Sequence, residues 1–241
     1  MKQIKKDIQI HYFPKQEIVA DSVELGSLEL RPSYPFIVSG GRNTERYYFK
    51  HVSKITDYKF NVRPEYFGNE SGYVDVFPER IKRILAEDAD AKIFCVFDWD
   101  TVYGNETNLK KHKLLERRLK KLLDAGRVVF CPSMPSIEYW FLLHFEDRTD
   151  LMRTYGKVNN RLGPHLKPLL EKLYEKDALP SIGKFLKKEK FLENDGWVKA
   201  LCEGGKLETA INIAEQNIVE AKKSNCLDDE SYSFVYRAFK N

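Results

Sequence analysis

The chain has 241 residues, a length that suits one large domain or a core domain with a smaller appendage. Hydrophobic residues make up 42% of it and aromatic residues 13%, which argues against disorder over the whole chain. Charged residues make up 32%, but the net charge is only +4, so overall charge indicates no partner and only local clusters can.

The cysteines and the apolar runs indicate the compartment. None of the four cysteines forms a C-x-x-C pair, and Cys95 and Cys131 lie in apolar runs, where a thiol behaves as a small core residue. Neither structural zinc nor a disulfide framework is therefore expected. No apolar run of membrane-spanning length occurs, and the N-terminus lacks the apolar region of a signal peptide. We expect a soluble, cytoplasmic protein without a membrane partner.

Residues 1–34 predict an N-terminal arm or edge hairpin, and strands then alternate with helices through residues 35–148. The predicted strands are 36–38, 58–64, 92–100 and 127–133, and the helices are 44–52, with Asn43 or Thr44 as N-cap, 76–90, 105–126 and 135–145. This alternation predicts an α/β fold with a mostly parallel sheet flanked by helices. In such sheets, reactive groups collect beyond the carboxyl ends of the strands.

From residue 149 the pattern changes, and no convincing strand follows. The segments 165–176, 206–223 and 231–240 are predicted to be helices. Residues 149–241 are therefore expected to form a helical C-terminal extension that packs against the sheet.

Two aspartates, Asp98 and Asp100, end the apolar strand "IFCVFDWD". Side chains at i and i+2 of a strand point to the same side, so the two carboxylates can converge. Such a pair repels unless a cation lies between them or one is protonated, and Mg²⁺ or Mn²⁺ would resolve the repulsion. The alternative is that the pair caps the next helix or marks a polar loop.

Two further acids follow other predicted strands. Glu45 lies in the first turn of a helix after the Gly40-Gly41 turn, where a carboxylate also favours the helix dipole. Glu138 is the only acid at the start of an apolar helix, and a buried charge there would need a partner, although the side chain could instead face solvent. His144 is expected to be a core histidine.

A basic helix follows the aspartate pair and is the best candidate contact for nucleic acid. It could equally be a solvated face. The second cluster, residues 184–190, is a weaker candidate of the same kind, and Arg42 could meet a phosphate after the paired glycines. The candidate nucleic-acid-binding residues are Arg42, Lys110, Lys111, Lys113, Arg117, Arg118 and Lys121.

Three segments together resemble the RloB-like family of Toprim-related proteins. They are "GGRNTERYYF" (residues 40–49), "FDWD" (97–100) and "MPSIEYWFLLHF" (134–145). The family patterns are E-G-x-x-T-E-x-x-Y-F, D-x-D and N-P-x-x-E-x-W-x-x-x-H-F. The resemblance is close over residues 35–145 and looser beyond them.

The resemblance implies a Toprim-like fold and metal-dependent phosphoryl-transfer chemistry in bacterial anti-phage defence. By resemblance, Asp98 and Asp100 would hold Mg²⁺ (or Mn²⁺), and Glu138 would be a further acid and metal ligand at the same site. The candidate catalytic acids are Glu45, Glu138 and Asp98. The implied partners are nucleic acid, DNA or RNA, and a companion ATPase-type defence protein, and the family allows an oligomer.

One position departs from the family pattern. The first glutamate of the E-G pair is Gly40 here, and Glu45 lies five residues further on. Two hypotheses follow. Either Glu45 or Glu138 takes over the missing role in a Mg²⁺-dependent nuclease, or the domain is catalytically silent and binds nucleic acid or a partner protein.

Overall fold

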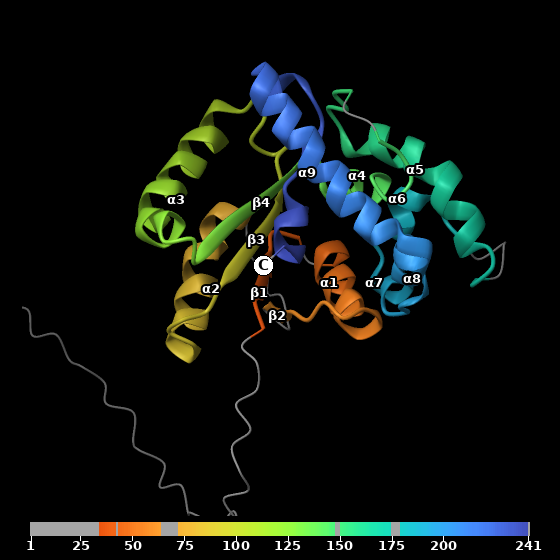
Figure 1. Ribbon diagram of the computed structural model, residues 1–241, viewed down its shortest axis with the longest axis horizontal. Coiled ribbons are helices and arrows are strands. Elements are labelled where there is room, and N and C mark those ends of the chain that lie inside the picture. The colour runs from red at the N-terminus through yellow and green to blue at the C-terminus, as the bar shows by residue number, and fades with distance from the viewer. Residues whose placement is uncertain (1–33, 42, 64–71, 148–149, 175–178, 241) are drawn as a thin grey trace, which may run out of the picture. The chain divides into compact units, whose positions relative to one another are not determined.

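The computed structural model describes residues 34–41, 43–63, 72–147, 150–174 and 179–240, all within one compact unit (Figure 1). Nearly all of the predicted arm, residues 1–34, lies outside the described residues, and so does Arg42.

A five-stranded sheet forms the centre of this unit, in the order β2-β1-β3-β4-β5. The first four strands are parallel, and β5 runs antiparallel to β4, so the mostly parallel sheet is confirmed. The strands are β1 (Phe36–Ser39), β2 (Asn61–Arg63), β3 (Ile93–Asp98), β4 (Val128–Met134) and β5 (Tyr232–Ser233).

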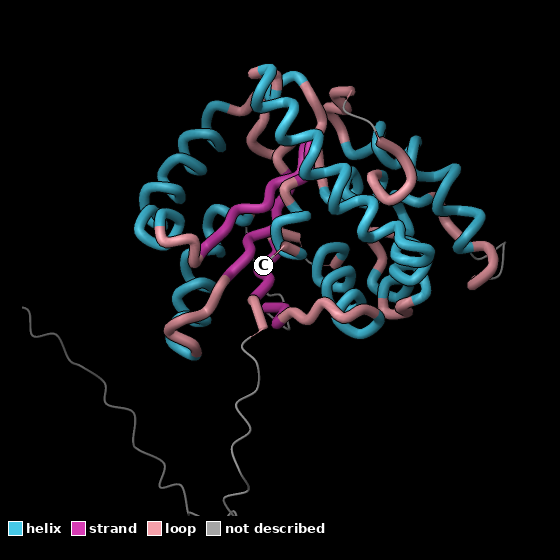
Figure 2. The backbone as a smooth tube through the Cα atoms, in the orientation of Figure 1, coloured by secondary structure: helices cyan, strands magenta, loops and turns pink. Residues whose placement is uncertain are grey.

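Helices cover both faces of the sheet, as Figure 2 shows. Residues of β3 alternate between two hydrophobic cores, with Phe94 and Val96 in one and Cys95 and Phe97 in the other. The first core includes residues of α1 (Thr44–Ile55) and α4 (Ile137–Leu142), and the second includes residues of α2 (Tyr73–Glu87) and α3 (Glu106–Asp124). Because both faces are buried, β3 reads as a continuous apolar run.

The segment after residue 150 is mainly helical and joins the first core. Its helices are α5 (Tyr155–Leu170), α6 (Ile182–Phe185), α7 (Glu189–Leu192), α8 (Gly196–Cys202) and α9 (Lys206–Ser224). The first of these begins ten residues before the predicted 165–176. Among the described helices, none combines the length and apolar character needed to cross a membrane.

The prediction of a helix over residues 231–240 is wrong. Tyr232 and Ser233 form β5 and complete the sheet, and a 3₁₀-helix, η4 (Val235–Phe239), follows. The Ser133 and Ser233 hydroxyls are hydrogen-bonded at 2.8 Å across the antiparallel pair. A strand of two residues is too short to show alternation, so the sequence carries no period-2 signal there.

Asn43 is the N-cap residue of α1, as predicted, but it does not cap the helix through its side chain. Instead, the Asn43 amide donates to the Lys187 carbonyl at 3.3 Å, and the Thr44 hydroxyl donates to the Leu186 carbonyl at 2.6 Å. The first turn of α1 is thus attached to a segment more than 140 residues away in the chain.

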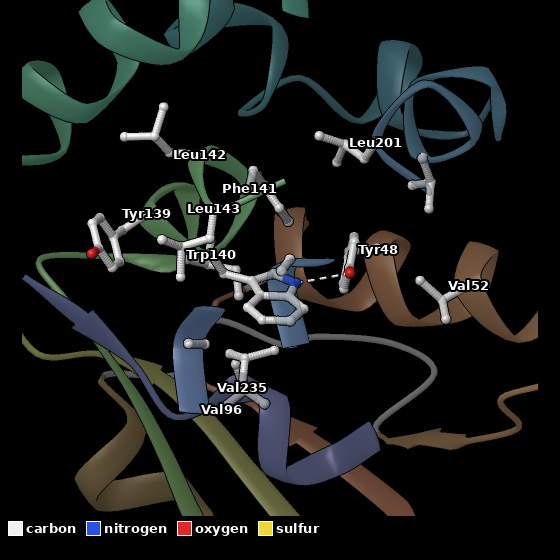
Figure 3. Close-up of a cluster of buried hydrophobic side chains, with 14 of the residues drawn as sticks. Tyr48, Val52, Val96, Tyr139, Trp140, Phe141, Leu142, Leu143, Leu201 and Val235 are labelled. Carbon is white, nitrogen blue, oxygen red and sulfur yellow. Dashed lines mark hydrogen bonds between the residues drawn. The ribbon is translucent and has the colours of Figure 1, made fainter. Parts of the chain in front are cut away.

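Trp140 joins α4, α1 and the C-terminal η4 in the first core (Figure 3). It is fully buried, and its indole N–H donates to the Tyr48 hydroxyl at 2.8 Å. Its ring stacks on Phe239 with centroids 5.6 Å apart. This side chain therefore holds together three segments that lie far apart in the sequence.

Removing the acceptor for Trp140 should destabilise the fold. Tyr48→Phe leaves a buried indole N–H without a partner, which costs roughly 1–3 kcal/mol. Urea unfolding followed by circular dichroism measures the change. Tyr47→Phe is the matched control, because the Tyr47 hydroxyl donates to Glu189, whose side chain is 54% exposed, so water can replace it. Equal losses in both variants would contradict the prediction.

Candidate functional site

Three neighbouring strands, β1, β3 and β4, end at the same edge of the sheet, and an acid follows or ends each of them. Asp98 is the last residue of β3. Glu45 and Glu138 lie in the first turns of α1 and α4 and are only 4% and 5% exposed. Parallel pairing of the strands thus brings together acids that are far apart in the chain.

Glu45 folds back from α1 toward the end of β1. Its Oε1 accepts a hydrogen bond from the Gly41 N–H at 3.0 Å. Burial, with a smaller contribution from the charge of Glu138, raises the pKa of Glu45 to about 7 against the lowering effect of hydrogen bonds from backbone N–H groups. A carboxyl with this pKa exchanges its proton near neutral pH.

Asp98 is the acid whose pKa responds to all three others. Burial raises the pKa of Asp98 well above its usual range, and the charges of Glu45, Glu138 and Asp100 add to that rise. One compensating bond comes from the Ile137 N–H, which donates to Asp98 Oδ1 at 2.9 Å. The four carboxyl groups therefore form one electrostatically coupled acidic site.

Glu138 and Asp100 complete the acidic site. Burial raises the pKa of each of them. The Ser136 hydroxyl donates to Glu138 Oε2 at 2.6 Å, and the Asp100 N–H donates to the Pro135 carbonyl at 3.0 Å. The inward position of Glu138 excludes the alternative that it faces solvent.

Lys187 is the cation beside these acids. Its charge lowers the pKa of both Asp100 and Glu138. Its ammonium lies 3.7 Å from the centroid of the Tyr155 ring, and its carbonyl accepts from Asn43. In the sequence, Lys187 is one of several lysines in the cluster 184–190, and nothing local distinguishes it. Its place at the site follows from long-range packing.

A pocket of about 410 Å³ opens beside the acidic site, between the end of β1 and the start of α3. Glu45 and Asp98 line it on the acidic side, and Lys111 and Asn108 line it on the α3 side. The other predicted basic residues of α3 are exposed on the same helix: Lys110, Lys113, Arg117, Arg118 and Lys121. Of these cations, only Lys111 lines the pocket.

Comparison with known proteins identifies the family of this chain. The model of the RloB-like protein family matches residues 35–240. The chain belongs to the RloB-like family. No curated protein and no solved structure matches it.

The RloB-like pattern places its first glutamate at Gly40, and the structure shows little room for one. A Cβ at Gly40 would lie 3.1 Å from the Cβ of Tyr73 and 3.2 Å from that of Phe97. The Tyr73 and Phe97 rings stack there, with centroids 4.2 Å apart. Glu45 instead brings its carboxyl to within hydrogen-bonding distance of the next residue, Gly41.

Carboxylate oxygens are the ligands that Mg²⁺ and Mn²⁺ prefer, so Asp98, Asp100 and Glu138 are the candidate metal ligands of this RloB-like chain. Across the described ranges, no three His, Cys, Asp or Glu side chains are grouped as a metal-binding cluster. Mg²⁺ commonly uses one or two carboxylates and keeps several waters. The donor chemistry therefore fits a magnesium ion held by two of these acids.

Gly41 is required by the position of the Glu45 carboxyl. A Cβ at residue 41 would overlap both carboxyl oxygens and lie 2.7 Å from Glu45 Cδ. We expect Gly41→Ala to cost roughly 1–3 kcal/mol of stability through overpacking. Gly72→Ala is the control in the same pocket, since a Cβ there meets nothing within 4 Å, and it should change stability by less than about 1 kcal/mol. Thermal unfolding of both variants measures the two losses of stability, and equal losses would contradict the prediction.

The raised pKa of Glu45 predicts a pH-dependent loss of stability. Since the folded pKa of about 7 exceeds the ordinary 4.5, this group favours folding below pH 4.5, and that contribution disappears as pH rises through 7. The shift corresponds to roughly 3 kcal/mol, at about 1.4 kcal/mol per pKa unit. Without divalent ions, Glu45→Gln should therefore stabilise the protein at pH 8 and have little effect at pH 4.

Urea unfolding in a chelator at the two pH values measures this difference. Glu220→Gln, at an exposed position on α9, controls for the loss of one negative charge. Equal effects of Glu45→Gln at both pH values would contradict the prediction.

Proposed function

We propose that this chain is a Mg²⁺-dependent nuclease that hydrolyses phosphodiester bonds in nucleic acid, as part of bacterial anti-phage defence. The coupled acidic site at the carboxyl edge of the sheet supports this proposal most directly. Four acids at one place, each with a raised pKa, would be stabilised in their charged forms by a divalent cation, which could also bind and activate a water molecule.

The proposed metal ligands are Asp98 with Asp100 or Glu138. When bound, Mg²⁺ would neutralise charge on the phosphate and make a bound water more acidic. Its charge would also offset the burial and the neighbouring carboxylates that raise the pKa of Asp98.

Glu45 is suited to accept the proton of the attacking water. Its pKa of about 7 lies near the pH at which a general base works best. One of its oxygens is held by the Gly41 N–H, which fixes the carboxyl against the pocket. This role replaces the glutamate that the family pattern places at Gly40.

Two cations would hold the substrate phosphates. Lys187 acts on the acids from the α5–α7 side, and Lys111 lines the pocket on the α3 side. The exposed lysines and arginines of α3 extend this positive surface away from the site. The role in defence rests on membership of the RloB-like family alone.

The test is cleavage of labelled single-stranded and double-stranded DNA and RNA with Mg²⁺ and with EDTA. Asp98→Asn keeps the shape and the Ile137 bond but removes the charge, and should lower the rate about a hundredfold or more. Asp57→Asn, at an exposed position outside the site, should leave the rate unchanged. If no substrate is cut in a way that depends on both Mg²⁺ and Asp98, the chain is not a nuclease of this kind.

Two observations favour a second candidate function, a catalytically silent module that binds nucleic acid or a partner defence protein. The first is the small space for a side chain at Gly40. The second is that no three His, Cys, Asp or Glu side chains among the described residues form a metal-binding cluster. For this function, Asp98→Asn would leave phage resistance in cells unchanged. Reversing the charges of Lys110, Lys113 and Arg117 would abolish it. Loss of resistance in the Asp98 variant would exclude the silent module.

A further inference from the structure

A second pocket, of about 220 Å³, lies beside the end of β3, where Phe97 and Trp99 line it. Its walls come from β3, α3, β4, α9 and the segment around β5. Figure 1 shows β4 running between α3 and α9, the two helices that contribute to this pocket. Its lining residues are mostly aromatic, with two cations and one acid at the rim.

Trp99 places this pocket next to the acidic site. It follows Asp98, the last residue of β3, and precedes Asp100 in the turn that comes next. Its ring packs edge-on against His112 at 4.9 Å and near Phe97 at 6.2 Å, on the α3 side of the sheet. The end of β3 and the turn after it thus carry an indole between two carboxylates of the acidic site.

The floor of the pocket is fixed by a buried hydrogen-bonded group. His112 Nδ1 bonds the Tyr73 hydroxyl at 3.0 Å, and its Nε2 lies 3.5 Å from the Glu116 carboxylate. Since a carboxylate only accepts, the proton of the neutral ring is on Nε2, and the Tyr73 hydroxyl donates to Nδ1. Both ring nitrogens are thereby occupied, so His112 supports Trp99 and is not available as a ligand.

Cations cover the opposite wall. The Arg237 guanidinium lies 4.4 Å from the centroid of the Phe234 ring, and the Lys222 ammonium lies 5.6 Å from it. Arg237 also donates to the Phe130 carbonyl at 3.4 Å, which holds it along β4. Aromatic faces beside cations are the combination that proteins use to hold unpaired bases of single-stranded nucleic acid.

We propose that this pocket binds an unpaired nucleobase of the strand whose phosphodiester lies at the acidic site, with Trp99 as the stacking face. This inference rests on the proposed function and adds to it a preference for single-stranded substrate. Arg237 and Lys222 would contact the phosphates on either side of the stacked base. A duplex keeps its bases paired and would not fill the pocket.

Tryptophan fluorescence tests this directly, because the chain has three tryptophans and Trp140 and Trp197 are both fully buried. Titration of the full chain in EDTA with a single-stranded oligonucleotide should cause a saturable loss of emission. Trp99→Phe should remove that loss but keep the affinity. Trp99→Leu should weaken binding roughly tenfold, as measured by anisotropy of a labelled strand.

A matched pair on α9 tests the cationic wall without touching the strand end. Lys222→Glu should weaken binding several-fold, whereas Lys223→Glu, also exposed, should have a much smaller effect. An oligonucleotide of abasic sites should bind without quenching Trp99. Quenching by a mononucleotide but not by a strand, or equal affinity of the Trp99→Leu variant, would overturn the proposal.

The outcomes separate this inference from the proposed function. Binding of a strand with quenching of Trp99 but without cleavage would support the proposed base-binding pocket and refute the proposed nuclease activity. Cleavage that is unaffected by Trp99→Leu would refute the proposed base-binding pocket and support the proposed nuclease activity. Failure to bind any strand would refute both.

Discussion

The burial of four carboxyl groups at one edge of the sheet is the constraint on which this structure depends, because burial raises the pKa of each and neighbouring carboxylates add to the rise for Glu45, Asp98 and Glu138. Three of the four are held by nearby donors: the Gly41 N–H for Glu45, the Ile137 N–H for Asp98 and the Ser136 hydroxyl for Glu138. These donors stand at the ends of β1 and β4, on either side of β3. The acids can therefore coexist only while three parallel strands keep their register, which ties the chemistry of the site to the fold.

The sequence predicts most of the sheet and the long helices for physical reasons. β3 is apolar throughout because both of its faces are buried, and α3 and α9 are long enough to show a helical period. The same rule fails at β5, whose two residues are specified by the edge of β4 and not by their own pattern.

The acids of the site follow from a general rule about the carboxyl ends of parallel strands. What the rule cannot supply is anything that depends on tertiary packing. Lys187 resembles its neighbours in sequence and becomes distinct only because Leu186 and Lys187 bond to the first turn of α1. The aromatic pocket at Trp99 was missed for the same reason, since its walls come from five separate elements.

The attachment of residues 186–189 to α1 has a consequence for how the site is assembled. All four acids lie before residue 140, yet the carbonyl groups that anchor Asn43 and Thr44, and the cation nearest to Glu138, come almost fifty residues later. A ribosome would have to release most of the chain before the acids acquired their final surroundings. The growing polypeptide would carry the reactive groups without the scaffold that orders them.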